Sequence, residues 1–216
     1  IAGPFAAAYG LLLVLVISFL TVGVFSDEMN SESRFVYYST KYGPTRGAVT
    51  KILAAFIIAT MLYWNGMLLM SLISFGGMGA GGAFTPIQAE SPYSMYGINF
   101  LERYLLILLS GYVACLFSAG MTMLLIVKTK SAISAVSISF LLFTGFPLVA
   151  GNGRLGNFRM LTPDRLFYVQ DNMNIPCVYQ FGNIVCSQSM LLLMIYSLLL
   201  IPVIAVSYQG FRKRCA

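Results

Sequence analysis

The sequence predicts an all-α membrane protein: a bundle of five transmembrane helices in a single domain over residues 1–216. Hydrophobic residues make up 58% of the chain and charged residues only 9%, whereas a typical globular protein is about a quarter charged. Five stretches of roughly 20 residues contain no charged residue, which is the length a helix needs to cross a bilayer core of about 30 Å. The basic residues, finally, concentrate on alternate connecting segments.

The five predicted spans are helices because their apolar runs do not alternate in polarity, as the strands of a membrane barrel would. In chain order they cover residues 5–25, 52–75, 104–127, 132–149 and 190–208. Their polar side chains are amides and hydroxyls, which serve either hydrogen bonding between helices or contact with a substrate. These residues are Asn65, Ser71, Ser74, Ser110, Ser118, Ser131, Ser134, Ser137 and Ser139.

The distribution of positive charge predicts the orientation of the bundle. Segments 26–51, 128–131 and 209–216 hold nine of the 13 Lys and Arg residues, although the segments between them are longer in total. Positive charge concentrates in cytoplasmic loops, so we place these three segments inside, with the N-terminus outside and the C-terminus inside. The net charge of +6 is then a signal of topology and of contact with lipid headgroups, and we expect no nucleic-acid partner.

Several classes of function are excluded by missing residue types. The chain has no histidine, which removes histidine-containing catalytic triads and zinc–histidine sites. The predicted spans carry no ionisable Asp, Glu, Lys or Arg, the groups that proton- and sodium-driven carriers place at membrane depth. The glycine-rich stretch 76–82 lacks the Lys-Ser/Thr of a phosphate-binding loop, and no CxxC pair indicates a metal site. We therefore expect no catalytic residue, no metal and no cofactor on this chain.

The longest predicted cytoplasmic segment, residues 26–51, mixes bases with aromatic side chains. Ser26 is predicted to cap a new helix, which Gly43-Pro44 would end before a second helix restarts near Arg46. One interpretation is an interfacial helix with aromatic groups at headgroup level and snorkelling bases. The other is a docking element, because Tyr and Arg carry much of the binding energy at protein interfaces.

This segment resembles the permease subunits of type-2 ATP-binding-cassette (ABC) transporters. The residues that carry the resemblance are Glu28, then Ser39-Thr40-Lys41-Tyr42-Gly43, then Arg46 and Lys51. Downstream, the short basic turn at 128–131, the Leu161-Thr162-Pro163-Asp164 stretch and the basic tail follow the same layout. The family's basic residue directly after the glycine is displaced here to Arg46. The family has six spans, so we expect this sequence to lack the N-terminal part and the first span.

The resemblance implies a function and a set of partners. The chain would be the membrane-spanning subunit of an ATP-driven exporter in a bacterial plasma membrane, paired with a second permease copy or a homologous permease. Hydrolysis of ATP with Mg²⁺ would occur on a separate ABC ATPase subunit, so the chain itself is not an enzyme. Segment 26–51 would be the coupling helix that contacts this ATPase. The contact residues would be Glu28, Arg34, Tyr37, Tyr38, Lys41, Tyr42 and Arg46.

The longest predicted outer segment, residues 150–189, is expected to contain either a surface loop or a short amphipathic or re-entrant element around 158–169. Cys177 and Cys186 both fall here, in a compartment that permits a disulfide, which predicts a bridge between them as an even alternative to two free thiols. Cys115 is expected to pack within a span, and Cys215 to lie in the reducing cytoplasm.

Two other classes of function compete with the exporter. A stand-alone channel or facilitator would need a polar face, and Ser131, Ser134 and Ser137 form such a stripe on the fourth span. A membrane scaffold or immunity protein would transport nothing. The chain is rich in Tyr, Phe and Met (13, 16 and 12 residues), which suits an amphipathic cargo such as a peptide, drug or lipid better than a bare ion.

Overall fold

The computed structural model describes residues 2–30, 43–79, 81–92, 94, 96–150, 160–174, 177–181 and 184–215. The chain is mostly helical, at 82%, and four of its helices are long and apolar enough to cross a membrane. The prediction of a helical membrane protein is confirmed at this level. The long helices are α1 (Ala2–Asn30), α3 (Gly43–Met78), α4 (Phe100–Thr129), α5 (Ala132–Ala150) and α8 (Gln188–Cys215).

Each predicted span falls within one of these helices, but the five are not equal in length. Four of them contain stretches of 21 to 32 residues that could cross a bilayer: Phe5–Phe25, Arg46–Gly77, Phe100–Thr129 and Gln188–Arg212. The apolar part of α5 that the structure describes, Ala132–Gly145, is shorter. A helix of that length reaches about 20 Å, less than the hydrocarbon thickness. The fifth span therefore stays a prediction.

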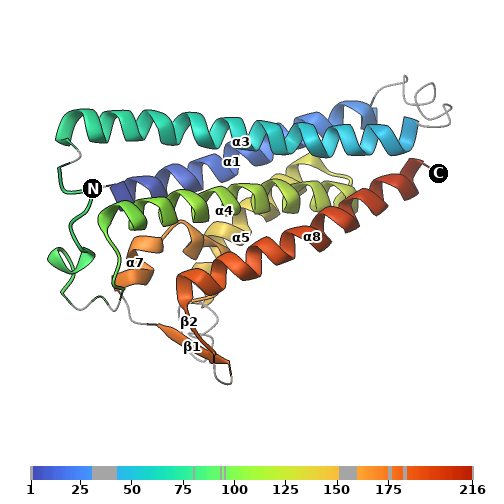
Figure 1. The fold of residues 1–216 in the computed structure, drawn as a ribbon. Coiled ribbons are helices and arrows are strands. Elements are labelled where there is room, and N and C mark those ends of the chain that lie inside the picture. Colours follow the sequence, from blue (N-terminus) through green and yellow to red (C-terminus); the bar gives the residue numbers. More distant parts are fainter. Residues whose placement is uncertain are drawn as a thin grey trace.

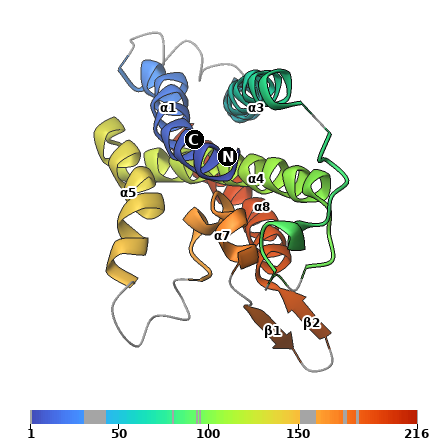
Figure 2. The same cartoon turned by 90° about the vertical axis from the view of Figure 1, so that its left-hand side faces the viewer.

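Helix α4 lies at the centre of the bundle and packs against each of the other four long helices. Figure 2 shows α3 and α5 on opposite sides of the bundle, with α1, α4 and α8 between them. The long helices alternate in direction along the chain. As a result, the end of α1, the start of α3, the α4–α5 turn and the end of α8 all lie at one end of the bundle (Figure 1). We call this the basic end, because Arg46, Lys51, Lys128, Lys130 and Arg212 lie there.

Two helix boundaries at the basic end differ from the prediction. Helix α1 continues without a break to Asn30, so Ser26 lies inside it and caps no new helix. The reason is that an N-cap forms only where the preceding chain is non-helical, and here the preceding turn already accepts these backbone N–H groups. Helix α3 begins at Gly43, so Gly43-Pro44 form its first turn and the helix begins three residues before Arg46. Proline suits the first turn of a helix, where its missing N–H costs nothing.

The α4–α5 connection is a tight turn. Lys130 adopts a left-handed conformation, with φ of 58°, and its backbone N–H donates to the Ile126 carbonyl at 3.1 Å. This geometry ends α4 and lets α5 begin two residues later, at Ala132. The predicted short basic turn is therefore present, and its Lys128 and Lys130 are both exposed.

At the opposite end, two segments fold over the bundle, and we call this the capped end. One contains the 3-10 helix η1 (Ile87–Ala89). The other contains the 3-10 helix η2 (Pro163–Leu166) and helix α7 (Val169–Asn174). In Figure 1, α7 lies alongside the first turns of α4 rather than beyond them. Of the predicted alternatives for this part, the surface loop does not fit, because Leu166, Phe167, Val169 and Met173 are all buried.

An antiparallel hairpin of two short strands, β1 (Val178–Phe181) and β2 (Ile184–Ser187), follows α7 and projects from the bundle. The sequence analysis did not predict it. A signal is present in the sequence: Gly182-Asn183 separates two runs rich in β-branched and aromatic residues, a pattern typical of a tight hairpin.

Candidate functional site

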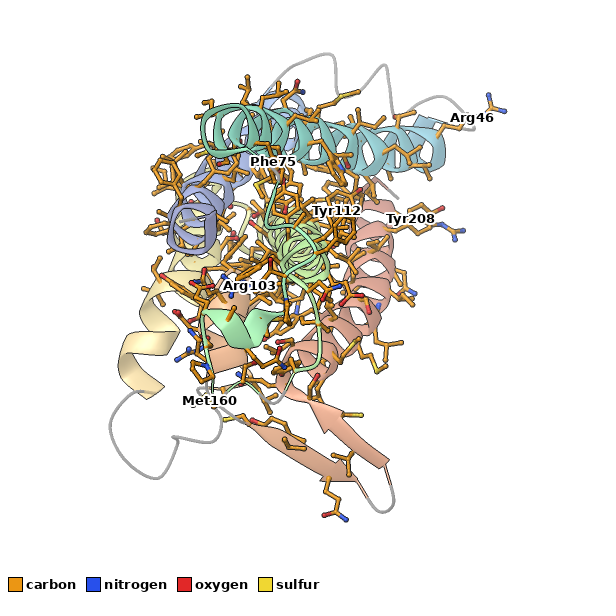
Figure 3. All side chains as sticks on the ribbon, turned by 60° about the vertical axis from the view of Figure 1, so that its left-hand side comes forward. Arg46, Phe75, Arg103, Tyr112, Met160 and Tyr208 are labelled. Carbon is orange, nitrogen blue, oxygen red and sulfur yellow. The ribbon has the colours of Figure 1, made fainter. Side chains whose placement is uncertain are left out.

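Most of the predicted coupling residues fall outside the described part of the chain. Arg34, Tyr37, Tyr38, Lys41 and Tyr42 lie in the 31–42 segment, which the structure does not describe. Glu28 belongs to the last turn of α1, although its side chain is also outside the described set. Arg46 lies in the first turns of α3, where it is exposed and points away from the bundle (Figure 3).

The two helices that flank this segment are tied to the last helix by aromatic contacts. Phe25 on α1 stacks on Phe211 of α8, with ring centroids 4.7 Å apart. The Lys51 ammonium of α3 lies 5.8 Å from the centroid of the Phe25 ring, within the range of a cation–π contact. One phenyl ring therefore joins α1, α3 and α8 at the basic end, directly beside the predicted coupling segment.

A cluster of hydroxyls joins three helices in the middle of the bundle. The Thr122 hydroxyl of α4 lies 3.1 Å from Ser18 Oγ of α1 and 3.0 Å from Ser139 Oγ of α5, and the two serine oxygens are 3.3 Å apart. All three residues are fully buried. Hydroxyl pairs of this kind hold membrane helices together at about 0.6 kcal/mol each. The cluster therefore accounts for Ser139 as a packing residue, the interhelical alternative of the prediction.

The serine stripe that favoured a channel does not line the interior. Ser131 and Ser134 hydrogen-bond to each other, with their hydroxyl oxygens 3.2 Å apart, and Ser137 is exposed on the outside of α5. The one serine of this helix that faces the core, Ser139, belongs to the hydroxyl cluster among the described residues.

Phe167 anchors the η2–α7 segment, which we call the wedge (residues 160–174), between the helices. Its ring lies against Gly10 of α1, so closely that a β-carbon at Gly10 would sit 2.2 Å from the ring. It also contacts Phe143 of α5, at 5.9 Å between ring centroids. Gly10 is five residues into the Phe5–Phe25 stretch, about 8 Å along the helix axis. The wedge therefore enters the bundle below the helix ends.

Hydrogen bonds from side chains to backbone carbonyls fix the wedge in place. On α8, the Gln188 amide donates to the Met160 carbonyl at 2.8 Å, and the Tyr196 hydroxyl donates to the Leu161 carbonyl at 2.8 Å. Asn172 of α7 donates to the Arg165 carbonyl at 2.8 Å. These part-buried bonds pair backbone carbonyls that are partly shielded from water, so losing a bond removes a partner that solvent replaces only incompletely.

The second cap segment is pinned to α4 through Arg103. Its guanidinium lies 2.9 Å from the Glu90 carboxylate and 5.3 Å from the centroid of the Phe100 ring. Figure 3 shows Arg103 next to η1. Ile87 of η1 is fully buried against Val169 and Met173 of the wedge segment. The two cap segments thus pack on each other as well as on the helices.

Asp164 places a carboxyl group inside this cap. It is buried, and its burial raises the pKa of the carboxyl group above the ordinary value, against the opposing influence of a hydrogen bond from Thr162 and the charge of Arg165. Its Oδ1 atom has no hydrogen-bond partner among the described residues. An ionised carboxylate is therefore unfavourable at this position.

A cavity of about 500 Å³ opens between α1, α3 and α4 near the capped end. Its walls are apolar and come mainly from Phe5, Met67, Met70, Ile73 and Ile107. Its polar groups include the Ser71 hydroxyl of α3 and the Tyr104 hydroxyl of α4, which hydrogen-bond to each other. The ring of Phe75 packs edge-on against the Tyr104 ring, with 5.5 Å between centroids.

Cys177 and Cys186 are both free thiols in the structure. The strand register explains the geometry: Cys186 pairs with Tyr179, and the Cys177 carbonyl accepts from the Gln188 N–H at 3.3 Å. The two cysteines are therefore diagonal rather than directly opposite, and diagonal side chains are about 7–8 Å apart. A bridge would need the strands to shift, and the disulfide stays a prediction that a thiol count can test.

The sequence analysis missed the residues that organise both ends. Phe25 and Phe211 gave no signal, because single aromatic residues near helix ends are common in membrane proteins. Gly10 and Phe167 are 157 positions apart in the chain, and nothing local relates them. Ser71 was recognised as a polar group within a span, but the pairing with Tyr104 could not be inferred without knowing the helix packing.

Comparison with known proteins adds no relative. No family model, no curated protein sequence and no solved structure matches this chain.

Proposed function

We propose that this chain is the membrane-spanning subunit of an ATP-driven exporter. A separate ATPase subunit binds at its basic end and drives transport. The observation that supports this most is the junction at that end. The helices on either side of segment 31–42, α1 and α3, meet α8 through Phe25, Phe211 and Lys51. A push on the segment between α1 and α3 would therefore be transmitted directly to a third helix.

Charge at the basic end also suits a protein partner. Arg46, Lys128, Lys130 and Arg212 are all exposed there. A solvent-facing basic surface at the cytoplasmic side would attract an acidic surface of a partner as well as anionic lipid headgroups. In this proposal Tyr38 and Lys41 make the contact with the ATPase, and a second permease copy or a homologous permease completes the pathway.

The test is purification in mild detergent from the cells in which the protein is made, followed by measurement of ATP hydrolysis in the purified material. We expect an ATPase subunit to co-purify with the chain. The double variant Tyr38→Ala/Lys41→Glu should lose the associated ATPase activity while inserting normally into the membrane. Asp171→Lys is the matched control, because it reverses an exposed charge at the capped end, away from the basic surface.

Two results would overturn the proposal. One is a double variant that retains its ATPase and its transport. The other is the purified chain alone, in liposomes without nucleotide, accumulating cargo against a gradient.

A further inference from the structure

We infer that the cavity between α1, α3 and α4 binds an uncharged single-chain amphiphile that carries a hydroxyl or an amide N–H near its apolar chain. The assignment of this ligand as cargo rests on the proposed function. The binding itself does not, because it follows from the shape and chemistry of the cavity.

Shape favours a chain-like ligand. The cavity runs along α3 from Met67 to Gly77, ten residues or about 15 Å of helix. Its volume of about 500 Å³ lies within the range of about 300–1,000 Å³ typical of ligand pockets. A smaller void lined by Tyr63, Gly111 and Phe167 shares Ala6, Met67 and Ile107 with it and continues the same line deeper into the bundle.

The walls favour an apolar, uncharged ligand. No lining residue carries a formal charge among the described residues of the cavity. Met67 and Met70 supply flexible, polarisable side chains that adapt to chains of different shape. The entrance faces lipid, since Phe5 and Ile73 are 60% and 72% exposed. An apolar chain that enters sideways from the hydrocarbon phase gains dispersion contacts with these walls.

The hydroxyl pair of Ser71 and Tyr104 determines which polar group the ligand is expected to carry. Ser71 has one proton, and its Oγ donates to the Met67 carbonyl in its own helix. The hydrogen bond between Ser71 and Tyr104 then uses the Tyr104 proton, with Ser71 Oγ as acceptor. The Tyr104 oxygen is left as an accepting atom of this pair, which favours a ligand that supplies a donor. A hydroxyl or an amide N–H meets this condition, whereas an ether or an ester does not.

The test is photolabelling in nanodiscs of dioleoyl phosphatidylcholine, a lipid without such a donor. The probe is a long-chain 1-alkanol with a diazirine on its chain. We expect labels on the α3 and α4 segments around Met70 and Ile107, and competition by the unlabelled alkanol but not by its methyl ether. Ser74→Phe should fill the cavity and abolish this labelling, whereas Ser197→Phe, the same change at an exposed position on α8, should not.

A conservative variant protects the test against misfolding. Tyr104→Phe removes the Tyr104 hydroxyl, and with it both the accepting oxygen and the hydrogen bond to Ser71. We expect it to weaken alkanol binding about fivefold, the size of one net hydrogen bond, while leaving the weak binding of the methyl ether unchanged. The inference is overturned if the exposed α8 residues Met190 and Met194 are labelled as strongly as the cavity. It is also overturned if the ether competes as well as the alkanol, or if Ser74→Phe labels like Ser197→Phe.

A second arm separates this inference from the proposed function. Where the ATPase co-purifies, the alkanol should stimulate ATP hydrolysis in the wild type and in Ser197→Phe but not in Ser74→Phe. Specific labelling without any ATPase partner would leave the site standing and remove the exporter. An ATPase subunit that co-purifies, together with labelling that is not specific to the cavity, would support the exporter and rule out the binding site.

Discussion

The two ends of the bundle are held together by different kinds of contact. At the capped end, Gln188, Tyr196 and Asn172 donate hydrogen bonds to backbone carbonyls of the wedge, and Arg103 is paired with Glu90. At the basic end, the described contacts between helices include an aromatic stack and a cation–π contact around Phe25. Hydrogen bonds are directional and are lost by a small displacement, whereas aromatic rings can slide against each other. Among the described residues, directional hydrogen bonds thus fix the capped end, whereas aromatic contacts join the helices at the basic end.

Helices α4 and α3 also differ in how much of each is buried within the bundle. In α4, 56% of the spanning stretch is buried within the bundle, whereas in α3 the share is 28%. Helix α3 thus combines a large lipid-facing surface with the cavity on its inner side and the predicted coupling segment at its start. A helix with fewer buried residues is less constrained by packing than the central helix, and α8, with 22% of its spanning stretch buried, shares this property with α3.

The largest effect is expected at the centre of the capped end. Phe167→Ala removes a buried ring between Gly10 and Phe143 and should lower the free energy of unfolding by about 3–5 kcal/mol. The measurement is unfolding in mixed SDS micelles followed by far-UV circular dichroism. Phe84→Ala is the control, because Phe84 is 77% exposed. Equal losses in the two variants would show that the wedge does not anchor the bundle.

A smaller loss of unfolding free energy is expected when one hydrogen bond at the capped end is removed. Gln188→Leu replaces the amide by an apolar group of similar length and removes the donor to the Met160 carbonyl. It should lower the free energy of unfolding by about 1–3 kcal/mol. The same unfolding experiment measures it, with Gln209→Leu, at an exposed position of the same helix, as the control. A cost no larger than that of the control would mean that the wedge is not held by this bond.

The sequence predicted the helices far better than their contacts. Long uncharged stretches such as 104–127 allow no other structure in a membrane, so hydropathy alone located the five long helices, four of which are long enough to span a bilayer. Side-chain pairing was beyond reach, because residues such as Gly10 and Phe167 meet only after the chain has returned twice through the bundle. The Ser26 boundary failed for a related reason: a capping signal has no effect inside a helix that tertiary contacts keep intact, as Phe25 does here through Phe211.

The two candidate sites differ in how far the sequence alone predicts them. The apolar character of Met67 and Met70 was visible in the sequence, but the cavity forms only where α1, α3 and α4 come together in the fold. The coupling segment is the opposite case. It was inferred from a short run of residues, Ser39–Gly43, and its proposed role depends on that resemblance together with the contacts at the ends of its flanking helices.

At the basic end the expected energies are smaller. A double-mutant cycle with Phe25→Leu and Phe211→Leu should give a coupling energy of about 0.5–1.5 kcal/mol, the usual size of an aromatic pair beyond its buried area. The cycle uses the same unfolding measurement, and each single variant controls for lost burial. A coupling energy of zero would remove the proposed link between α1 and α8.

The hydroxyl cluster between the two ends should contribute less still. Ser139→Ala removes one member and is expected to cost about 0.6 kcal/mol, because the remaining Ser18–Thr122 hydrogen bond is kept. Ser137→Ala, two positions away on the exposed face of α5, provides the matched control in the same assay. A larger cost at Ser137 than at Ser139 would contradict the assignment of the cluster as a packing element.

The effect expected at Asp164 depends on pH. Burial raises the pKa of this carboxyl group above its ordinary value of 3.8, so the folded state favours the protonated form. Its contribution to stability is therefore complete below the ordinary pKa and is lost as the pH rises through the raised pKa. The difference in unfolding free energy between Asp164→Asn and the wild type should accordingly grow in favour of the variant from acidic toward neutral pH. Asp171→Asn, at an exposed position of α7, should show no such trend, and a difference for Asp164→Asn that is flat with pH would mean that the wedge does not bury this carboxyl group.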